Sequence, residues 1–237
     1  EEGEEGAARE HQLVATVERV GGSLVGPNCI GVITPAYPGV FTTPIPPIDP
    51  AGCDLISGSG ATAVFIMEAG VPKGLRFSRV FSVGNSAQIG VEEVLEYLDA
   101  VTPDGTEPAG AARSAGPGAR NPKLLYIESI RDPAKLLRHA RSLIAKGCRI
   151  AAVKAGSSEA GSRAASSHTG ALAGSDAAVD ALLRKAGIVR CRSREELASV
   201  GVLFSHPPFT GNRIAVITHA GGPAVMLTDT LSEGGFE

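Results

Sequence analysis

The sequence has no tryptophan and only 4% aromatic residues, so its core must be packed mainly from Val, Ile, Leu and Ala. No apolar run approaches the roughly 20 residues that a membrane helix needs. The acidic start, residues 1–6, does not resemble a signal peptide. A net charge of −3 provides no general attraction to nucleic acid or to an anionic membrane. These absences favour a globular protein whose partners are neither nucleic acid nor membrane.

The sequence also lacks a C-x-x-C motif, since its four cysteines are scattered along the chain. No cluster of His, Cys and acidic residues has the spacing of metal ligands, so we expect no metal site. Reduced, mostly buried thiols are typical of a cytoplasmic protein, which is the location we expect.

What the chain does contain is a regular alternation of strand-like and helix-like segments from residue 54 onward. The expected strands cover residues 54–57, 79–83, 124–128, 149–154 and 187–190. The expected helices cover residues 9–20, 61–69, 91–99, 133–146, 174–186 and 194–204. Such alternation predicts an α/β fold, in which a parallel sheet carries helices on both faces.

Three segments interrupt this pattern. The Pro-rich residues 35–50 and the stretch 206–212 are expected to be irregular linkers. Residues 102–122, rich in Pro, Gly and Ala, are interpreted as a surface insertion without chemistry. After the second linker, residues 213–218 predict the first strand of another α/β unit.

An internal echo supports that second unit. Residues 56–68 match residues 217–229 at a constant offset, each reading as a strand, a glycine turn and a helix. The simplest interpretation is two related halves in tandem, the second incomplete. Convergence on one turn chemistry would give the same echo.

One histidine stands apart from the other four. His168 lies in residues 155–174, a stretch of Gly, Ser and Ala that buries little apolar area to offset its ordering entropy. A loop of this composition is typical of a segment that moves or that approaches a ligand closely. An imidazole with a pKa near ~6.5 is a usable nucleophile at neutral pH. The alternative is a polar loop histidine with no role.

Two further candidates follow predicted strands. Glu128 ends the strand 124–128, and the carboxyl ends of parallel strands are where α/β sites form. The turn Ser57, Gly58, Ser59, Gly60 joins a strand to a helix, which is the geometry of an anion site. The plainer alternatives are a surface glutamate paired with Arg131 and a glycine turn that serves geometry alone.

Several motifs together resemble one family. In chain order they are Gly26-Pro-Asn-Cys29, the turn 57–60, Ser82-Val-Gly-Asn85, residues 127–132, and residues 154–161 with Ser167-His-Thr-Gly170. This order is similar to that of the NDP-forming acyl-CoA synthetases (acetate–CoA ligase, ADP-forming) of the succinyl-CoA ligase superfamily. The resemblance implies flavodoxin-like sheets in tandem. It also implies three domains: 1–48, the remnant of a Rossmann-like CoA-binding domain; 49–205, a ligase domain carrying the histidine loop; and 206–237, the start of a second ligase domain.

The resemblance also implies a reaction, the interconversion of acyl-CoA, ADP and phosphate with carboxylate, CoA and ATP through an acyl phosphate and a phosphohistidine. It assigns the phosphoryl carrier to His168 and the carboxylate that orients it to Glu128. Phosphate binding falls on Ser57, Gly58, Ser59, Gly60, Thr169 and Gly170, and a weaker CoA contact falls on Asn28. CoA is the implied cofactor, while ADP or ATP and Mg²⁺ would be supplied mainly by an ATP-grasp subunit or fused domain, in a hetero- or homo-oligomer.

Two parts of the family pattern are absent from the sequence, namely most of the CoA-binding half and the ATP-grasp part. We therefore expect a fragment of an α subunit that does not turn over alone. Three alternatives stay open: a non-catalytic CoA-binding regulatory module, as in fused protein lysine acyltransferases; a succinyl-CoA ligase-type α subunit; and a flavodoxin-like binding domain without a covalent step.

Overall fold

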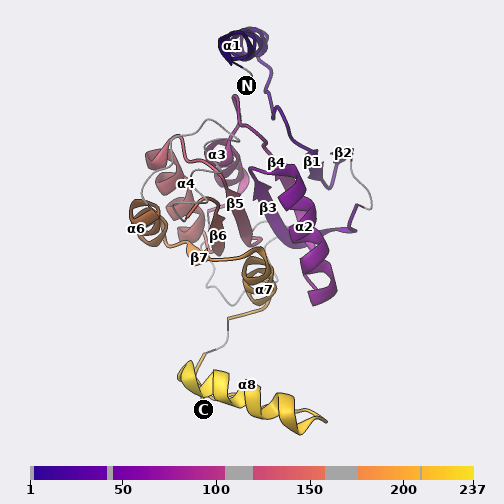
Figure 1. The fold of residues 1–237 in the computed structure, drawn as a ribbon, viewed down its shortest axis with the longest axis vertical. Helices are drawn as coiled ribbons and strands as arrows, with labels where there is room; N and C mark the ends of the chain where they lie inside the picture. Colours follow the sequence, from indigo (N-terminus) through magenta and orange to yellow (C-terminus); the bar gives the residue numbers. More distant parts are fainter. Residues whose placement is uncertain (1–2, 42–44, 105–119, 158–175, 209) are drawn as a thin grey trace. The chain divides into compact units, whose positions relative to one another are not determined.

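The computed structural model describes residues 3–41, 45–104, 120–157, 176–208 and 210–237 (Figure 1). The chain divides into two compact units, residues 1–206 and 207–237. The finer division of the chain into domains stays a prediction. His168, Thr169 and Gly170 lie outside the described residues.

The first unit alternates strands and helices, as the sequence pattern predicts. Its strands are β1 (Gly31–Thr34), β2 (Tyr37–Val40), β3 (Ile48–Ser57), β4 (Phe77–Ser82), β5 (Lys123–Ile127), β6 (Ile150–Lys154) and β7 (Val189–Cys191). Its helices are α1 (Gly3–Arg19), α2 (Gly60–Gly70), the short 3-10 helix η1 (Val71–Lys73), α3 (Val91–Val101), α4 (Pro133–Ala145), α6 (Asp176–Ala186) and α7 (Arg194–Phe204).

The strands form one seven-stranded sheet in the order β2-β1-β4-β3-β5-β6-β7. The five strands from β4 to β7 in this order are parallel, whereas β1 runs antiparallel to both β4 and β2. The chain leaves β3 toward β4 on one side and returns to place β5 on the other side. The carboxyl ends of β3 and β5 therefore flank the point where the strand order reverses, which is where ligands bind in open α/β sheets.

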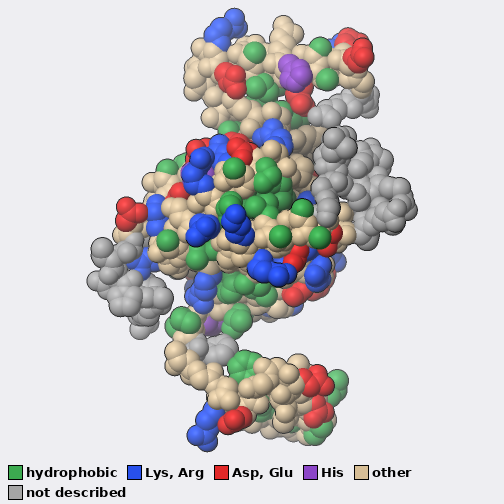
Figure 2. Space-filling view, turned by 90° about the vertical axis from the view of Figure 1, so that its left-hand side faces the viewer, with side chains coloured by type: hydrophobic (Ala, Val, Ile, Leu, Met, Phe, Trp, Pro, Cys, Tyr) green, Lys and Arg blue, Asp and Glu red, His purple; other side chains and the backbone are tan. Residues whose placement is uncertain are grey.

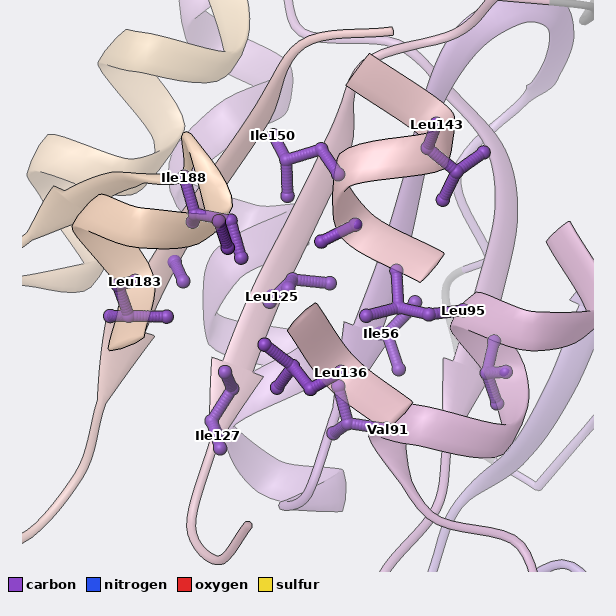
Figure 3. Close-up of a cluster of buried hydrophobic side chains, with 14 of the residues drawn as sticks. Ile56, Val91, Leu95, Leu125, Ile127, Leu136, Leu143, Ile150, Leu183 and Ile188 are labelled. Carbon is purple, nitrogen blue, oxygen red and sulfur yellow. The ribbon is translucent and has the colours of Figure 1, made fainter. Parts of the chain in front are cut away.

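Helices cover both faces of the sheet, which confirms the predicted fold class (Figure 1). On one face, α3, α4 and α6 pack on the sheet through Leu95, Leu136 and Leu183, all fully buried (Figure 3). On the other face, α2 and α7 pack through Ile66 and Leu197, also fully buried. Within a helix the buried residues recur at helical spacing, as Leu136, Ala140 and Leu143 do on α4. Burial of one apolar side of each helix therefore accounts for the layered fold.

The face carrying α4 and α6 is rich in Lys and Arg at its surface (Figure 2). These two helices contribute exposed Arg138, Arg141, Arg184 and Lys185. Within the described residues, no helix is both long enough and apolar enough to cross a membrane.

The expectation that residues 35–50 are irregular is wrong, because they contain β2 and the start of β3. The strands β1 and β2 form a tight hairpin in which Gly31 pairs with Val40. Gly31 has φ +112°, and a Cβ atom on it would lie 2.1 Å from the Gly39 carbonyl oxygen. Pro38 is tolerated because β2 is the edge strand of the sheet, where its missing N–H breaks no ladder.

The expected strand at residues 213–218 is also wrong, since the described chain is not extended into a sheet there. A strand needs a neighbouring strand for its backbone hydrogen bonds, and the described part of residues 207–237 contains none. The helix of this unit, α8 (Gly221–Glu233), does form. The second flavodoxin-like domain stays a prediction.

The internal echo has a local structural counterpart. The Ser57 hydroxyl donates to the Ser59 carbonyl at 2.6 Å and accepts from the Ser59 N–H at 3.2 Å. The Thr218 hydroxyl makes the same two bonds to Ala220, at 3.4 Å and 3.1 Å. The same hydroxyl-closed turn therefore precedes both α2 and α8.

Candidate functional site

The carboxyl ends of the central strands bring several polar residues to one edge of the sheet. Ser82 ends β4, Ser57 ends β3, Glu128 follows β5 and Lys154 ends β6. The register pairs Ser57 with both Ser82 and Tyr126, and Ile127 with Lys154, so these four ends lie level with one another. The topology alone thus assembles a polar edge from segments far apart in the sequence.

The turn at residues 57–60 is held in shape by its own serines. Ser57 closes the turn as described above, and the Ser59 hydroxyl caps α2 by accepting from the Thr62 N–H at 3.3 Å. The Gly58 N–H donates to the Tyr126 carbonyl at 2.9 Å, which ties the turn to β5. Within the described residues, the N–H groups of Gly60 and Ala61 have no hydrogen-bond acceptor. Two donors at the positive end of a helix are suited to an anion.

Glu128 lies against this turn. A Cβ atom on Gly58 would lie 3.4 Å from the Glu128 Cγ, an ordinary contact distance, so the turn and the Glu128 side chain are immediate neighbours. The neighbouring Tyr126 hydrogen bonds to Thr62 on α2; burial raises the pKa of its hydroxyl, and the charge of Glu128 raises it further. Glu128 is therefore a partly buried acid beside the start of α2.

Lys154 adds positive charge next to this acid. Its Nζ donates to the Ala155 carbonyl at 2.5 Å. Burial lowers the pKa of the Lys154 ammonium, whereas the nearby charges of Glu128 and Asp176 oppose that change. The pair provides one negative and one positive group at adjacent strand ends.

The Gly26–Cys29 turn packs on the other side of the helix start. A Cβ atom on Gly60 would lie 2.6 Å from the Ile30 Cγ2, so only glycine allows this close approach. The turn is tied to the motif at residues 82–85, because the Asn85 N–H donates to the Pro27 carbonyl at 2.9 Å. Asn28 has φ +56° and donates to the Asn85 side chain at 3.3 Å. Shaping of the turn is thus one function that Asn28 performs.

These segments enclose a pocket of about 540 Å³. Its described lining consists of Asn28, Cys29, Ile30, Phe41, Gly58, Ser59, Gly60, Ala61, Val64, Phe65 and Glu128. The structure therefore brings together Asn28, three residues of the 57–60 turn and Glu128. Ser57 is fully buried beneath the turn. The roles assigned to these residues stay predictions, as do those of His168, Thr169 and Gly170.

Sequence reasoning missed the apolar part of this pocket. Ala61, Val64 and Phe65 recur at helical spacing along α2, a pattern that equally marks a core-facing helix side. Phe41 and Ile30 come from segments whose approach to α2 depends on the β1–β2 hairpin. The helical spacing of these α2 residues was the available signal, but it does not distinguish a helix side that faces the core from one that faces a ligand pocket.

The cysteines match the expectation of mostly buried thiols. Cys53, Cys148 and Cys191 are buried, and Cys29 is half-buried at the pocket. Burial raises the pKa of the Cys191 thiol to about 11, so that thiol is protonated at neutral pH. Within the described residues, no cluster of His, Cys, Asp and Glu could hold a metal ion.

Sequence reasoning also missed a buried glutamate that supports the segment carrying Glu128. Glu92, in the first turn of α3, is 2% exposed. Its Oε1 accepts from the Arg131 N–H at 2.7 Å and from the Asp132 N–H at 3.2 Å. Asp132 in turn caps α4 by accepting from the Lys135 N–H at 2.9 Å. The Glu92 carboxylate therefore holds the segment that links β5 to α4 in place.

We expect Glu92→Ala to lower the free energy of unfolding by about 1–3 kcal/mol, because it leaves two backbone donors without their acceptor. Glu92→Gln keeps a carbonyl oxygen at that place, so its free energy of unfolding should fall by less than that of Glu92→Ala. Urea unfolding of both variants measures the difference. Glu96→Ala, on an exposed residue of the same helix that pairs with Lys135, is the control and should cost less than about 1 kcal/mol. Equal losses in all three variants would contradict this role for Glu92.

Comparison with known proteins places these features in context. Residues 50–104 and 121–204 match the family described as succinyl-CoA ligase like flavodoxin domain. The α subunit of acetate–CoA ligase [ADP-forming] II from Pyrococcus furiosus is 34% identical over 237 residues, which cover 100% of this chain and 48% of that protein. The 4-hydroxybutyrate–CoA ligase [ADP-forming] from Nitrosopumilus maritimus is 32% identical over 97% of this chain and 31% of that protein.

Among solved structures, acetyl-coenzyme A synthetase 1 from Candidatus Korarchaeum cryptofilum, in complex with phosphate and ADP, superimposes with a TM-score of 0.76. It is 27% identical to this chain and covers 96% of it, while the chain covers 46% of that structure. The chain thus spans about half or less of the length of these relatives.

Proposed function

The chain belongs to the family of succinyl-CoA ligase-like flavodoxin domains, and from this membership we propose that it is the α part of an ADP-forming acyl-CoA synthetase. One observation supports the proposal most directly. The turn at residues 57–60, Glu128 and Asn28, which lie far apart in the sequence, line a single pocket where the strand order reverses.

The proposed reaction has three steps. Phosphate attacks the thioester carbonyl, the C–S bond breaks, and acyl phosphate and CoA form. A ring nitrogen of His168 attacks the phosphorus, and the bond from phosphorus to the acyl oxygen breaks to release the carboxylate. The terminal phosphate oxygen of ADP then attacks phosphohistidine, the P–N bond breaks, and ATP forms.

The residues around the pocket suit the second step. The N–H groups of Gly60 and Ala61 would donate to the phosphoryl oxygens at the positive end of α2. The Glu128 carboxylate would hold one imidazole nitrogen, fix the tautomer and stabilise the positive ring during transfer. Thr169 and Gly170 are proposed to contact the same phosphoryl group.

The proposal includes partners that this chain does not supply. The nucleotide, with Mg²⁺, would be bound mainly by an ATP-grasp subunit or fused domain, and CoA would reach the pocket beside Asn28. We also propose a cytoplasmic location, where ATP, CoA and reduced thiols coexist. The chain by itself should not produce ATP.

Labelling with ATP tests the proposal. The complete gene product that carries this chain, together with its nucleotide-binding part, is incubated with ATP labelled at the γ-phosphate. We expect an acid-labile, base-stable label that ADP removes as ATP and that His168→Ala abolishes. His139→Ala, on a helix of the opposite sheet face, is the matched control and should keep the label.

Other outcomes identify the competing functions. An intact complex that takes up no label is a CoA-binding regulatory module or a flavodoxin-like binding domain, and the proposal is then wrong. If the His168→Ala variant still takes up label, a residue other than His168 carries the phosphoryl group. Turnover of succinate in preference to other acids would favour a succinyl-CoA ligase-type α subunit.

A further inference from the structure

The pocket is polar at one end and apolar along one side. Its polar groups, Asn28, Ser59 and Glu128, lie around the start of α2. Its apolar side chains are those of Ile30, Phe41, Val64 and Phe65, which we call the apolar wall. A ligand with a charged head and an apolar tail matches this division, because each part then meets groups of its own kind.

We propose that the apolar wall binds the acyl chain of the substrate and selects monocarboxylic acids with an apolar chain longer than that of acetate. This inference rests on the proposed function, which puts the phosphoryl group of the acyl phosphate at the start of α2, with the acyl group attached to it. It adds a substrate class and the residues that determine it.

The spacing along α2 supports a longer chain. Val64 and Phe65 follow Gly60 by four and five residues, which is about 6–8 Å at 1.5 Å per residue. The acetyl group of an acetyl phosphate whose phosphate is bound at the N–H groups of Gly60 and Ala61 would end before it reached these two side chains. A chain of several carbons would extend from the turn to both side chains and remove apolar surface from water.

Phe65, one of the two aromatic residues of the apolar wall, has a cationic neighbour on α7. The Arg194 guanidinium on α7 lies over the Phe65 ring, 5.1 Å from its centroid. Arg194 also pairs with Glu195 at 2.5 Å. This cation–π contact favours one position of the Phe65 ring beside the pocket.

The charge of the lining argues against dicarboxylic acids. None of the described lining residues is Lys or Arg, and the one acid among them is Glu128. A second carboxylate on the substrate would be transferred from water to the apolar wall without a partner, which is costly. Succinate should therefore be a poorer substrate than an apolar acid of equal length.

The pantetheine arm of CoA is the other occupant that an apolar surface here could contact. The two occupants predict different kinetics. If the wall contacts the acyl chain, its mutation changes the relative rates of different acids. If it contacts pantetheine, the KM for CoA rises by the same factor whichever acid is used.

Steady-state kinetics distinguish these cases. The complete gene product, together with its nucleotide-binding part, is assayed with CoA, ATP and one of four acids: acetate, butyrate, phenylacetate or succinate. We expect kcat/KM for butyrate to exceed that for acetate by about tenfold or more, as expected for added methylenes in an apolar pocket. Val64→Phe, which narrows the pocket, and Phe65→Ala, which removes part of the wall, should each reduce this ratio by about tenfold. Leu203→Ala, on an exposed residue of α7 outside the lining, is the control.

Phe65 is 46% exposed, so Phe65→Ala tests the wall even if Val64→Phe does not fold. A parent protein that prefers acetate or succinate would overturn the inference. An unchanged ratio with a raised KM for CoA would overturn it too, in favour of pantetheine. If either of these results is found but ATP still labels the protein, the substrate inference is wrong and the proposed function stands. If no acid yields a thioester and ATP does not label the protein, both the substrate inference and the proposed function are wrong.

Discussion

Replacing Glu128 by glutamine is expected to slow phosphoryl transfer between ATP and the protein by about 10²–10⁴-fold, the usual contribution of a group that orients or exchanges protons with a reacting imidazole. The amide keeps the size of the side chain but loses its charge, so a positive ring formed during transfer is no longer stabilised. Because glutamine and glutamate have nearly the same shape, the variant should fold normally. Rapid-quench measurement of label uptake gives the rate.

A matched control separates this effect from a general loss of negative charge near α2. Glu68 lies exposed on the same helix and does not line the pocket, so Glu68→Gln should retain the parent rate. If Glu128→Gln labels within about threefold of the parent, the carboxylate does not assist the transfer. A lower rate with altered circular dichroism would point to folding instead.

Lys123→Ala is expected to lower the free energy of unfolding by about 3–5 kcal/mol, the usual cost of leaving one partner of a buried ion pair alone. The Lys123 Nζ lies 2.7 Å from the Asp54 Oδ2, and both side chains are fully buried where β3 and β5 pair. Within the described residues, the Asp54 Oδ1 already has no hydrogen-bond partner. Loss of the ammonium would leave the carboxylate with only Arg79, at 3.6 Å.

A double-mutant cycle gives this prediction a second readout. Asp54→Leu combined with Lys123→Met removes both charges, so it should recover most of the stability that Lys123→Ala loses. Urea unfolding of the single and double variants measures the coupling. Arg79→Ala, which removes the longer and more exposed contact, is the control and should cost much less. A double variant as unstable as the single one would show that volume matters here rather than charge.

Much of the fold could be predicted, because burial of one side of a helix or strand makes apolar residues recur at a regular spacing in the sequence. The helix of residues 194–204 agrees with its expected range, and the expected strand 149–154 differs from β6 by one residue. The hairpin of β1 and β2 could not be predicted, since Pro38 and Gly39 disfavour strands locally and only pairing with β1 overcomes this. Residues 213–218 are the converse, a strand-like sequence that pairs with no strand in the part of the chain that the structure describes.

The candidate site was predictable where it depends on strand ends. The turn at 57–60 and Glu128 follow strands that a parallel sheet places side by side. Glu92 and Phe41 were not predictable, because their positions result from tertiary packing between segments that are not neighbours in the sequence. The contact of the His139 Nδ1 with the Asp99 Oδ2, at 2.8 Å, was not predictable for the same reason.

The two borders of the sheet have a consequence for aggregation. At one border, Pro38 in β2 lacks the N–H that a further strand would require. At the other, β7 is only three residues long and contains Arg190, a charged residue of the kind that discourages strand addition. Neither border offers a long unpaired template, so we expect this sheet to resist growth into amyloid-like fibrils by edge-to-edge addition.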